Sequence, residues 1–163
     1  MNENSIAVNI AMMKIARPPQ TLYSLGLGSC IGVAIYDPVA KIGGLLHALL
    51  PRIGEFGGEG HSRAKFADSG IEDLVEMLEA RGAKRSRLKA KIAGGAAMFA
   101  LKPGSSIGDI GKRNVQSAVE TLKKLGIEIV AQDTGGNKGR TILFDVGTGQ
   151  LTVRTIDRSV KVI

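Results

Sequence analysis

Short apolar segments, several of them alternating apolar and polar positions, run through most of the chain. Alternation with a period of two is typical of strands with one buried face, and short apolar runs bounded by glycine or proline are typical of buried strands. The pattern predicts strands at residues 6–15, 21–25, 31–36, 42–50, 88–93, 127–131, 141–146 and 151–156. Prolines such as Pro18, Pro19 and Pro51 follow predicted strands, where their missing N–H interrupts no sheet hydrogen bond.

Two other segments repeat apolar residues at the spacing of an α-helix. The first extends from Ser62, a residue type favoured as N-cap, to Gly82. The second covers residues 112–125, with two lysines in its last turn and Gly126 after it, which is typical of a helix end. The pattern therefore predicts an α/β fold, with α+β as the alternative: a layered, mixed and largely antiparallel sheet with two main helices.

The composition fits a single domain over residues 1–163. Of the 163 residues 44% are hydrophobic, enough for a sizeable core, and the 22 glycines are spread among turns without a repeat. The first residues lack the basic segment of a secretory signal, and no apolar run approaches the ~18 residues of a membrane span. A single cysteine forms no intramolecular disulfide, and a free reactive thiol suits a reducing compartment. We expect a cytoplasmic protein without membrane insertion.

The chain is basic, with a formal charge of +7 and a pI near 9.8. Binding to nucleic acid is one explanation of this charge. However, aromatic residues make up only 4% of the chain, so stacking platforms are scarce, and no helix-turn-helix or zinc-finger signature is present. The densest basic run covers residues 84–91. Within it, Arg87, Lys89 and Lys91 alternate with the apolar residues Leu88, Ala90 and Ile92, which predicts a strand with one solvated face. We expect no nucleic-acid partner, and attraction to an acidic protein fits better.

Candidate chemistry begins at Cys30, which follows a glycine-rich turn containing Gly26 and Gly28. Glycines let backbone amides crowd against a bound carbonyl, so amides near Ser29 and Cys30 are candidates for an oxyanion hole. A cysteine acts as the thiolate, and a neighbouring imidazole lowers its pKa and returns the proton to the leaving group. His47 is the expected partner, because residues 42–50 should return antiparallel to residues 31–36 and bring it toward Cys30.

Simpler interpretations apply to the same residues. A lone cysteine flanked by apolar residues is often a small core residue, and His47 is also consistent with a hydrogen-bonded core histidine. The other histidine, His61, adjoins a glycine-rich segment at residues 54–60 that is typical of a flexible loop or a lid. It is therefore a weaker candidate than His47.

Other motifs exclude several functions. The Gly26-Leu27-Gly28 segment lacks the third glycine of a dinucleotide-binding loop, and no segment has Walker A spacing. One cysteine and two separated histidines make a poor zinc site, so we expect no metal and no cofactor. The segment from Asp133 to Asn137 has turn chemistry, with a contribution of Asp133 to a substrate groove as the alternative.

Taken together, these motifs resemble a known family. The segments that carry the resemblance are Ser24-Leu25-Gly26-Leu27-Gly28-Ser29-Cys30-Ile31-Gly32-Val33-Ala34-Ile35-Tyr36-Asp37-Pro38, Gly43-Gly44-Leu45-Leu46-His47-Ala48-Leu49-Leu50-Pro51, Lys65-Phe66-Ala67-Asp68, Lys91-Ile92-Ala93-Gly94-Gly95-Ala96-Ala97-Met98-Phe99, Ile110-Gly111-Lys112-Arg113-Asn114 and Asp133-Thr134-Gly135-Gly136-Asn137-Lys138-Gly139-Arg140. Their order closely resembles the CheD family, the chemoreceptor glutamine deamidases of bacterial and archaeal chemotaxis, over about residues 22–154.

The resemblance implies a layered α/β fold and a role for three residues. Cys30 would be the nucleophile, His47 the base, and Ser24 would occupy the position of a threonine in the family. Serine keeps the hydroxyl but lacks the methyl group that stiffens the threonine rotamer. Apart from the resemblance, Gly28, Ser29 and Asp133 are candidates for holding the oxyanion or the substrate.

The implied activity is hydrolysis of glutamine side-chain amides in the helical bundle of a chemoreceptor, with release of ammonia and without a cofactor. An alternative role, also implied by the family, is that of an adaptor that binds and stimulates a CheC-type phosphatase. A third and weaker alternative is a basic module that associates with nucleic acid.

Overall fold

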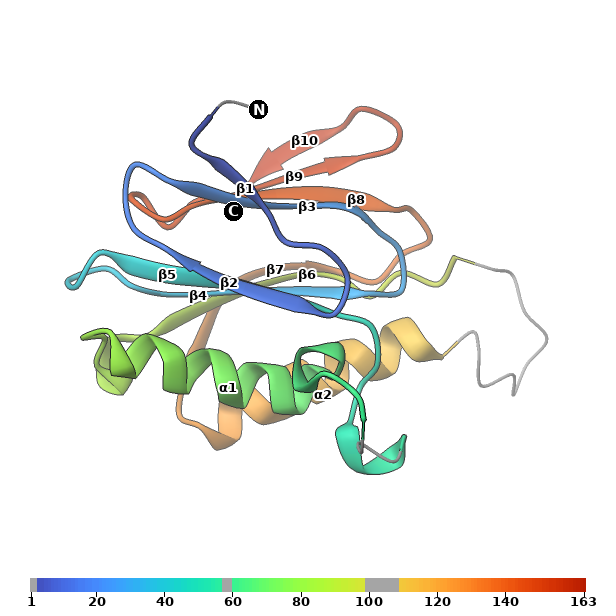
Figure 1. The fold of residues 1–163 in the computed structure, drawn as a ribbon. Helices are drawn as coiled ribbons and strands as arrows, with labels where there is room; N and C mark the ends of the chain where they lie inside the picture. The colour runs from blue at the N-terminus through green and yellow to red at the C-terminus, as the bar shows by residue number, and fades with distance from the viewer. Residues whose placement is uncertain (1–2, 57–59, 99–108) are drawn as a thin grey trace.

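A computed structural model describes residues 3–56, 60–98 and 109–163, and in these residues the chain forms three layers. One five-stranded sheet packs on a second five-stranded sheet, and two helices cover the outer face of the second sheet (Figure 1). Most neighbouring strands are antiparallel. The predicted fold class, a layered α/β arrangement with a mixed, largely antiparallel sheet system and two main helices, is confirmed.

The first sheet forms the layer farthest from the helices (Figure 1). Its strands, in spatial order, are β1 (Ser5–Ala7), β3 (Thr21–Leu27), β8 (Arg140–Asp145), β9 (Leu151–Thr155) and β10 (Val160–Val162). Strands β1 and β3 are parallel, whereas the other neighbours are antiparallel.

The second sheet is the middle layer and carries both the strand after Cys30 and the strand of His47. Its order is β2 (Met12–Ala16), β5 (Ile42–Ala48), β4 (Ile31–Asp37), β6 (Lys89–Gly94) and β7 (Glu128–Thr134). Strands β4 and β5 form the predicted antiparallel hairpin, and β6 and β7 pair in parallel. Every residue of β4 and β5 is buried, as expected for strands covered on both faces.

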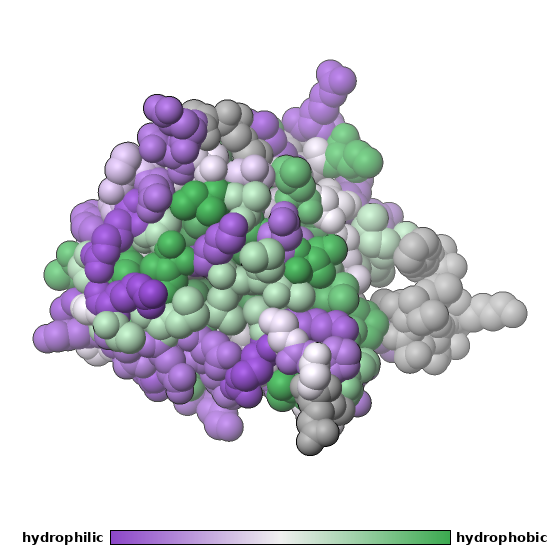
Figure 2. Space-filling view, viewed as in Figure 1, coloured by the Kyte–Doolittle hydropathy of each residue, from purple (hydrophilic) through white to green (hydrophobic). Residues whose placement is uncertain are grey.

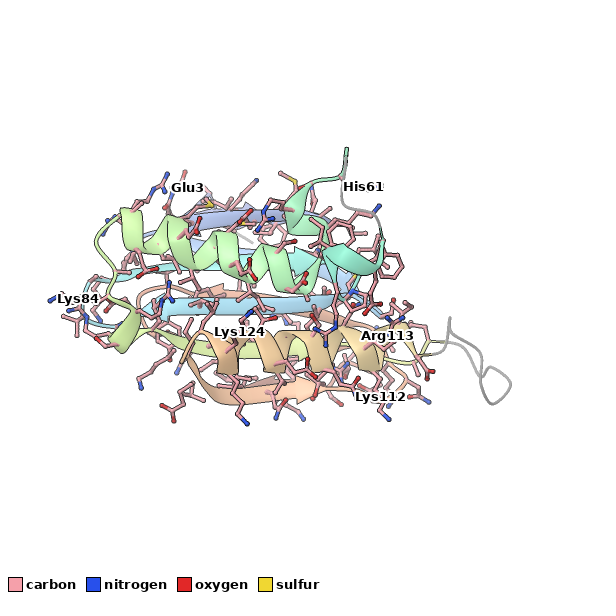
Figure 3. All side chains as sticks on the ribbon, turned by 90° about the horizontal axis from the view of Figure 1, so that it is seen from below. Glu3, His61, Lys84, Lys112, Arg113 and Lys124 are labelled. Carbon is pink, nitrogen blue, oxygen red and sulfur yellow. The ribbon has the colours of Figure 1, made fainter. Side chains whose placement is uncertain are left out.

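The helices lie side by side beneath the second sheet (Figure 3). They are α1 (Ala67–Ala80) and α2 (Ile110–Lys124), and three short 3₁₀ helices are η1 (Ile53–Glu55), η2 (Arg63–Lys65) and η3 (Arg85–Arg87). Helix α2 agrees closely with the prediction, including the glycine after its C-terminus, since Gly126 has a φ of 75°. Among the described residues, none of the helices is both long and apolar enough to cross a membrane.

Alternation along β4 divides its side chains between two cores. Ile31, Val33 and Ile35 pack with the apolar faces of the helices, whereas Cys30, Ala34 and Tyr36 face the core between the two sheets. Seen from the side, apolar residues gather over the strands, with hydrophilic residues bordering them over the helix layer (Figure 2). Cys30 therefore belongs to the space between the sheets, not to the helix-facing core.

The structure differs from the predicted elements in three places. Residues 6–15 form two strands in different sheets, because the chain turns between them, with Ala11 at a φ of 62° and the Met12 amide bonded to the Asn9 carbonyl. Ser62 caps only η2, since Phe66 is extended and forms a bridge with Leu50, so α1 begins at Ala67. Strand β10 was not predicted.

The basic run is also different from its prediction. Lys91 is partly enclosed: its ammonium lies 5.9 Å from the centre of the Tyr36 ring and donates to the Ile163 carbonyl. Arg87 pairs with the buried Asp37. The prediction of a strand with one solvated basic face therefore holds only in part: Arg87 and Lys91 are half-buried and engage other segments, and Arg87 lies in η3 before the strand.

Candidate active site

Cys30 ends the turn between β3 and β4 and is 7% exposed, with a free thiol. The three carbonyls of this turn are all held by hydrogen bonds. The Gly28 carbonyl accepts from the Ala96 amide at 2.9 Å, and the Cys30 carbonyl accepts from the Gly95 amide at 2.8 Å. The Ser29 carbonyl accepts from the side-chain amide of Asn114 at 2.8 Å. The backbone around the thiol is thus held by the segment after β6 and by Asn114.

Two glycines shape this turn. Gly26 has a φ of 62° and lies where the pairing of β3 with β8 shifts register, a conformation that favours glycine. A side chain on Gly28 would begin 3.0 Å from Met98 Cγ, so Gly28 leaves room for a Met98 side chain that is 45% exposed. The glycine-rich segment therefore forms a turn of defined conformation, and the partly exposed Met98 side chain lies against it.

His47 lies in the middle of the second sheet, with Gly32 of β4 on one side and Met12 of β2 on the other. It is 2% exposed, and its Nδ1 atom lies 3.1 Å from the Val8 carbonyl oxygen. A carbonyl only accepts, so Nδ1 carries the proton in the neutral ring and Nε2 carries the lone pair. Nε2 is buried and has no hydrogen-bond partner in the described residues. The neutral imidazole thus carries its free lone pair on a buried nitrogen, as a general base would require.

Cys30 and His47 occupy the same face of one sheet. His47 is directly opposite Gly32, and Cys30 lies two positions before Gly32, so alternation places both side chains toward the first sheet. Gly32 itself has no side chain, and the ends of the Ile142 and Leu27 side chains fill the space above it. No hydrogen bond joins the thiol to Nε2 in the described part of the chain; such bonds in catalytic pairs often form only with substrate bound.

Ser24 joins this group through a shared carbonyl. Its hydroxyl donates to the Val8 carbonyl at 2.8 Å, the same oxygen that accepts from His47 Nδ1. Ser24 is 1% exposed and Val8 is similarly buried. The hydroxyl therefore contacts the histidine indirectly, by fixing its acceptor. Val8 was not singled out in the sequence, because a backbone carbonyl leaves no signature in residue type.

Burial shifts both titratable groups toward their neutral forms. Burial raises the pKa of the Cys30 thiol above its ordinary 9.0, although a hydrogen bond from its own amide opposes this. Burial lowers the pKa of His47 below its ordinary 6.5, although its bond to the Val8 carbonyl opposes this. Without substrate, burial therefore favours the neutral thiol and the neutral imidazole.

Asp133 lies apart from these residues. It is in β7, and β6 separates it from β4, which places its backbone roughly 10 Å from that of Gly32. Its carboxylate is within ion-pair distance of Arg140 Nε, at 3.5 Å, and of Lys161 Nζ, at 3.7 Å. The structure thus engages Asp133 with two cations and does not bring it together with Cys30.

His61 is exposed, and its ring meets the edge of the Phe66 ring with the centroids 6.2 Å apart. It lies at the same end of the helix layer as Arg113 (Figure 3). In the described residues no contact joins it to Cys30 or His47. Residues 57–59 of the glycine-rich loop predicted beside it lie outside the described residues.

No metal site accompanies the candidate residues in the described ranges, where no three His, Cys, Asp or Glu side chains are grouped closely enough to hold an ion. Two residues that the sequence analysis did not assign to the site do support it. Asn114 holds the Ser29 carbonyl, and Arg140 bonds to the carbonyls of Gly94 and Gly135. Both stand in segments that carry the family resemblance, which was the available signal.

Comparison with known proteins identifies a family model and relatives that match this chain. A family model described as CheD chemotactic sensory transduction matches residues 49–155. A curated relative from Clostridium novyi, named probable chemoreceptor glutamine deamidase CheD, is 46% identical and aligns over all of both chains. A relative of the same type from Methanosarcina acetivorans is 50% identical over 97% of this chain and 96% of its own length.

The chain belongs to the CheD family. The family model begins after Cys30 and His47, whereas the relative from Clostridium novyi aligns across the whole turn and both strands. Among solved structures, a Neisseria meningitidis protein of the DUF152 family matches 86% of this chain and 72% of its own, at 10% identity and a TM-score of 0.48.

Proposed function

We propose that this CheD chain hydrolyses glutamine side-chain amides in chemoreceptors, with Cys30 as the nucleophile and His47 as the base. One observation carries the proposal: a buried free thiol shares a sheet face with a buried imidazole whose Nε2 is unpartnered in the described residues. A thiol with an adjacent base is the arrangement that thiol-dependent amide hydrolysis requires. The curated relatives, named as probable chemoreceptor glutamine deamidases, indicate the substrate.

In the first step, Cys30 Sγ attacks the amide carbon while its proton passes to His47 Nε2. The N–H groups of Ser29 and Cys30 stabilise the negative oxygen that develops. The carbon–nitrogen bond then breaks, and Nε2 returns the proton to the leaving nitrogen, which departs as ammonia. The product of this step is a thioester between Cys30 and the receptor side chain.

In the second step, a water molecule gives a proton to His47 Nε2 and adds to the thioester carbon. The carbon–sulfur bond breaks, the thiol recovers its proton, and the receptor keeps a glutamate. One amide and one water are thus converted to one carboxylate and one ammonium ion. Ser24 assists indirectly, since its hydroxyl fixes the Val8 carbonyl that orients His47.

The test is intact-mass spectrometry of a chemoreceptor cytoplasmic fragment incubated with the wild type, with Cys30→Ala and with His47→Gln. We expect the fragment to gain about one dalton per modified glutamine with the wild type and nothing with Cys30→Ala. His47→Gln should be slower by about 100-fold or more, because general base catalysis contributes at least that much. Equal mass gains with the wild type and Cys30→Ala would refute the proposed nucleophile.

The CheC-type phosphatase partner, the cytoplasmic location and the absence of a nucleic-acid partner stay predictions. The adaptor role predicts a different result for the Cys30→Ala variant. An adaptor would stimulate the phosphatase equally well with and without the Cys30 thiol, whereas deamidation requires it. Phosphatase assays with the wild type and Cys30→Ala therefore separate the two roles.

A further inference from the structure

The turn that carries Cys30 presents its backbone in one orientation. The carbonyls of Gly28 and Ser29 are held by the Ala96 amide and by Asn114. Because the C=O and N–H of one peptide unit point in opposite directions, the N–H groups of Ser29 and Cys30 are turned away from Ala96 and Asn114. In the described part of the chain, neither N–H donates to an acceptor in another residue. These two donors are thus available to a substrate oxygen.

Asn114 controls one of these two peptide units. It lies in the second turn of α2, is fully buried, and donates to the Ser29 carbonyl at 2.8 Å and to the Leu49 carbonyl at 3.0 Å. Only the NH₂ end of an asparagine can donate to two carbonyls, so the orientation of this amide is decided by its partners. Leu49 stands two positions after His47. One side chain therefore joins the turn of Cys30 to the strand end of His47.

The acceptor end of the Asn114 side chain shows that packing alone does not explain why an asparagine occupies this position. Asn114 Oδ1 is buried and has no partner in the described residues. Leaving a buried acceptor unpaired is unfavourable, and an apolar side chain would avoid it. What the asparagine provides in return is its pair of donors to the two strand ends of the candidate site.

We propose that Asn114 is a positioning residue that holds the Ser29–Cys30 peptide unit so that the Cys30 N–H faces the oxyanion. The proposal rests on the proposed deamidase function. Asn114 does not touch the substrate; it acts through the peptide whose carbonyl it binds. An oxyanion donor stabilises the transition state and not the bound amide, so its misplacement should lower kcat while leaving KM nearly unchanged.

The experiment compares Asn114→Ala and Asn114→Asp with a control on the same helix, Ser117→Ala. Ser117 is also buried, and its hydroxyl donates to the Pro51 carbonyl at 2.5 Å; in the described residues no hydrogen bond joins its side chain to the turn of Cys30. Asn114→Asp keeps the shape of the side chain, but its ionised carboxylate only accepts and faces two carbonyl oxygens. All variants are first checked for folding by circular dichroism and thermal unfolding.

Three readouts are measured on each folded variant. They are kcat and KM on a receptor fragment, the rate of Cys30 alkylation by iodoacetamide, and inhibition by a peptide carrying an aldehyde in place of the glutamine amide. The aldehyde forms a tetrahedral adduct whose oxygen needs the same donors, whereas alkylation at a carbon–iodine bond creates no oxyanion. Alkylation therefore reports the thiol and its access alone.

For the Asn114 variants we expect kcat to fall about 10- to 100-fold, the aldehyde to bind more weakly by a similar factor, and KM and alkylation to change less than about twofold. Ser117→Ala should stay within about twofold of the wild type in all three readouts.

Unchanged kcat, or a parallel loss of kcat and alkylation, would overturn the proposal, since the second result means a disturbed thiol. If neither Asn114 variant folds, the residue serves the fold and the proposal is likewise overturned. Failure of the deamidase function itself is recognised separately, by wild type that produces no Cys30-dependent mass gain.

Discussion

At the scale of single residues, the candidate site depends on how burial acts on Cys30 and His47. Both groups lie between the sheets, where charge is disfavoured, so the pKa of the thiol is raised and that of the imidazole is lowered. Both shifts disfavour a thiolate–imidazolium pair before substrate binds. In the proposed mechanism the proton would therefore move to Nε2 during the attack, with His47 as a general base.

This arrangement predicts two separate pH profiles. The ratio kcat/KM should fall only where His47 becomes protonated, and because its pKa is lowered, the acid midpoint should lie below the ordinary 6.5. Alkylation of Cys30 requires the thiolate, and because its pKa is raised, the alkylation rate should still be rising at the ordinary 9.0. Cys30 is the only cysteine, so iodoacetamide labelling followed by mass spectrometry reports it specifically.

The control for this measurement is Cys30→Ala, which should take up no label. An alkylation rate that levels off near neutral pH would contradict the prediction, because it would mean that the thiolate already exists beside a protonated His47. That outcome would leave the identity of the nucleophile intact and change only the resting state of the pair.

The two principal site residues were accessible to sequence reasoning, but their supporting contacts were not. Cys30 and His47 stand out because the chain has one cysteine and two histidines. The β4–β5 hairpin that brings them to one face pairs two strands that follow each other in the sequence. Val8 acts through its carbonyl, which every residue type has, and it reaches His47 across 39 positions of sequence. Asn114 reaches Ser29 across 85 positions. Neither contact has a periodic pattern that a sequence could display.

At the scale of elements, the close approach of α2 to the segment after β6 brings Asn114 to the turn. A side chain on Gly111 would lie 2.7 Å from the backbone of Gly95 and would also overlap the Ala96 carbonyl. A side chain on Gly95 would collide with Val115. The amides of Gly95 and Ala96 hold the turn of Cys30, so helix, segment and turn form one packed unit.

Gly111→Ala tests this unit. Helix propensity alone predicts that the substitution raises the free energy of unfolding, whereas we expect it to lower that free energy. Alanine in a helix is normally favoured over glycine by about 1 kcal/mol. Here the added methyl meets backbone atoms that cannot rotate away, so we expect a net loss of about 1–3 kcal/mol in unfolding free energy. The turn should also be disturbed, with a lower kcat. Denaturant unfolding and the receptor mass assay measure the two effects.

Gly70→Ala in α1 is the matched control. A side chain on Gly70 would lie 2.8 Å from the terminal carbons of Leu46, which are the far end of a flexible side chain. We expect a smaller change in stability and no change in kcat. A stabilising effect of Gly111→Ala would show that α2 can move away from Gly95 at little cost and would contradict the packed unit.

The elements themselves were predictable where the pattern is local. Strands β4, β5, β6, β8 and β9 and helix α2 agree with their predicted segments within a few residues. The division of residues 6–15 was missed because both halves are apolar, and only the turn at Ala11 sends them to different sheets. The separation into two sheets and the parallel β6–β7 pairing depend on contacts between distant segments, which alternation along one strand does not report.

At the scale of the whole molecule, the candidate site and a second polar cluster lie at opposite ends of β4. Cys30 precedes this strand and Asp37 ends it, and seven residues at about 3.3 Å each separate them by roughly 20 Å. Arg113, next to Asn114, and Lys84, whose amide binds Asp37, lie at opposite ends of the helix layer (Figure 3). The basic residues around Lys84 therefore do not border the site.

Asp37 ties several segments together at its end of the molecule. Its side chain is 0% exposed and accepts from the amides of Val39, Ala40 and Lys84 and from Arg87 Nε. Burial alone would raise the pKa of this carboxyl, but the Arg87 and backbone hydrogen bonds outweigh burial and hold the pKa well below its ordinary 3.8. The unfolded chain then binds more protons than the folded chain in acid. The stability contributed by ionised Asp37 is thus present above about pH 3.8 and is lost as pH falls through the lowered pKa.

Asp37→Asn should therefore separate stability from catalysis. The variant keeps the shape of the side chain but loses the charge that Arg87 and three amides bind, so we expect the unfolding free energy at pH 7 to fall by about 2–4 kcal/mol. Its stability should also decline less steeply below pH 3.8 than that of the wild type. Because the cluster is remote from Cys30, kcat should stay unchanged at temperatures where the variant is folded.

The control is Glu128→Gln, which removes an exposed ion pair with Lys89 and should alter neither the unfolding free energy nor kcat measurably. A large loss of kcat in folded Asp37→Asn would mean that β4 transmits the disturbance along its whole length to the turn of Cys30.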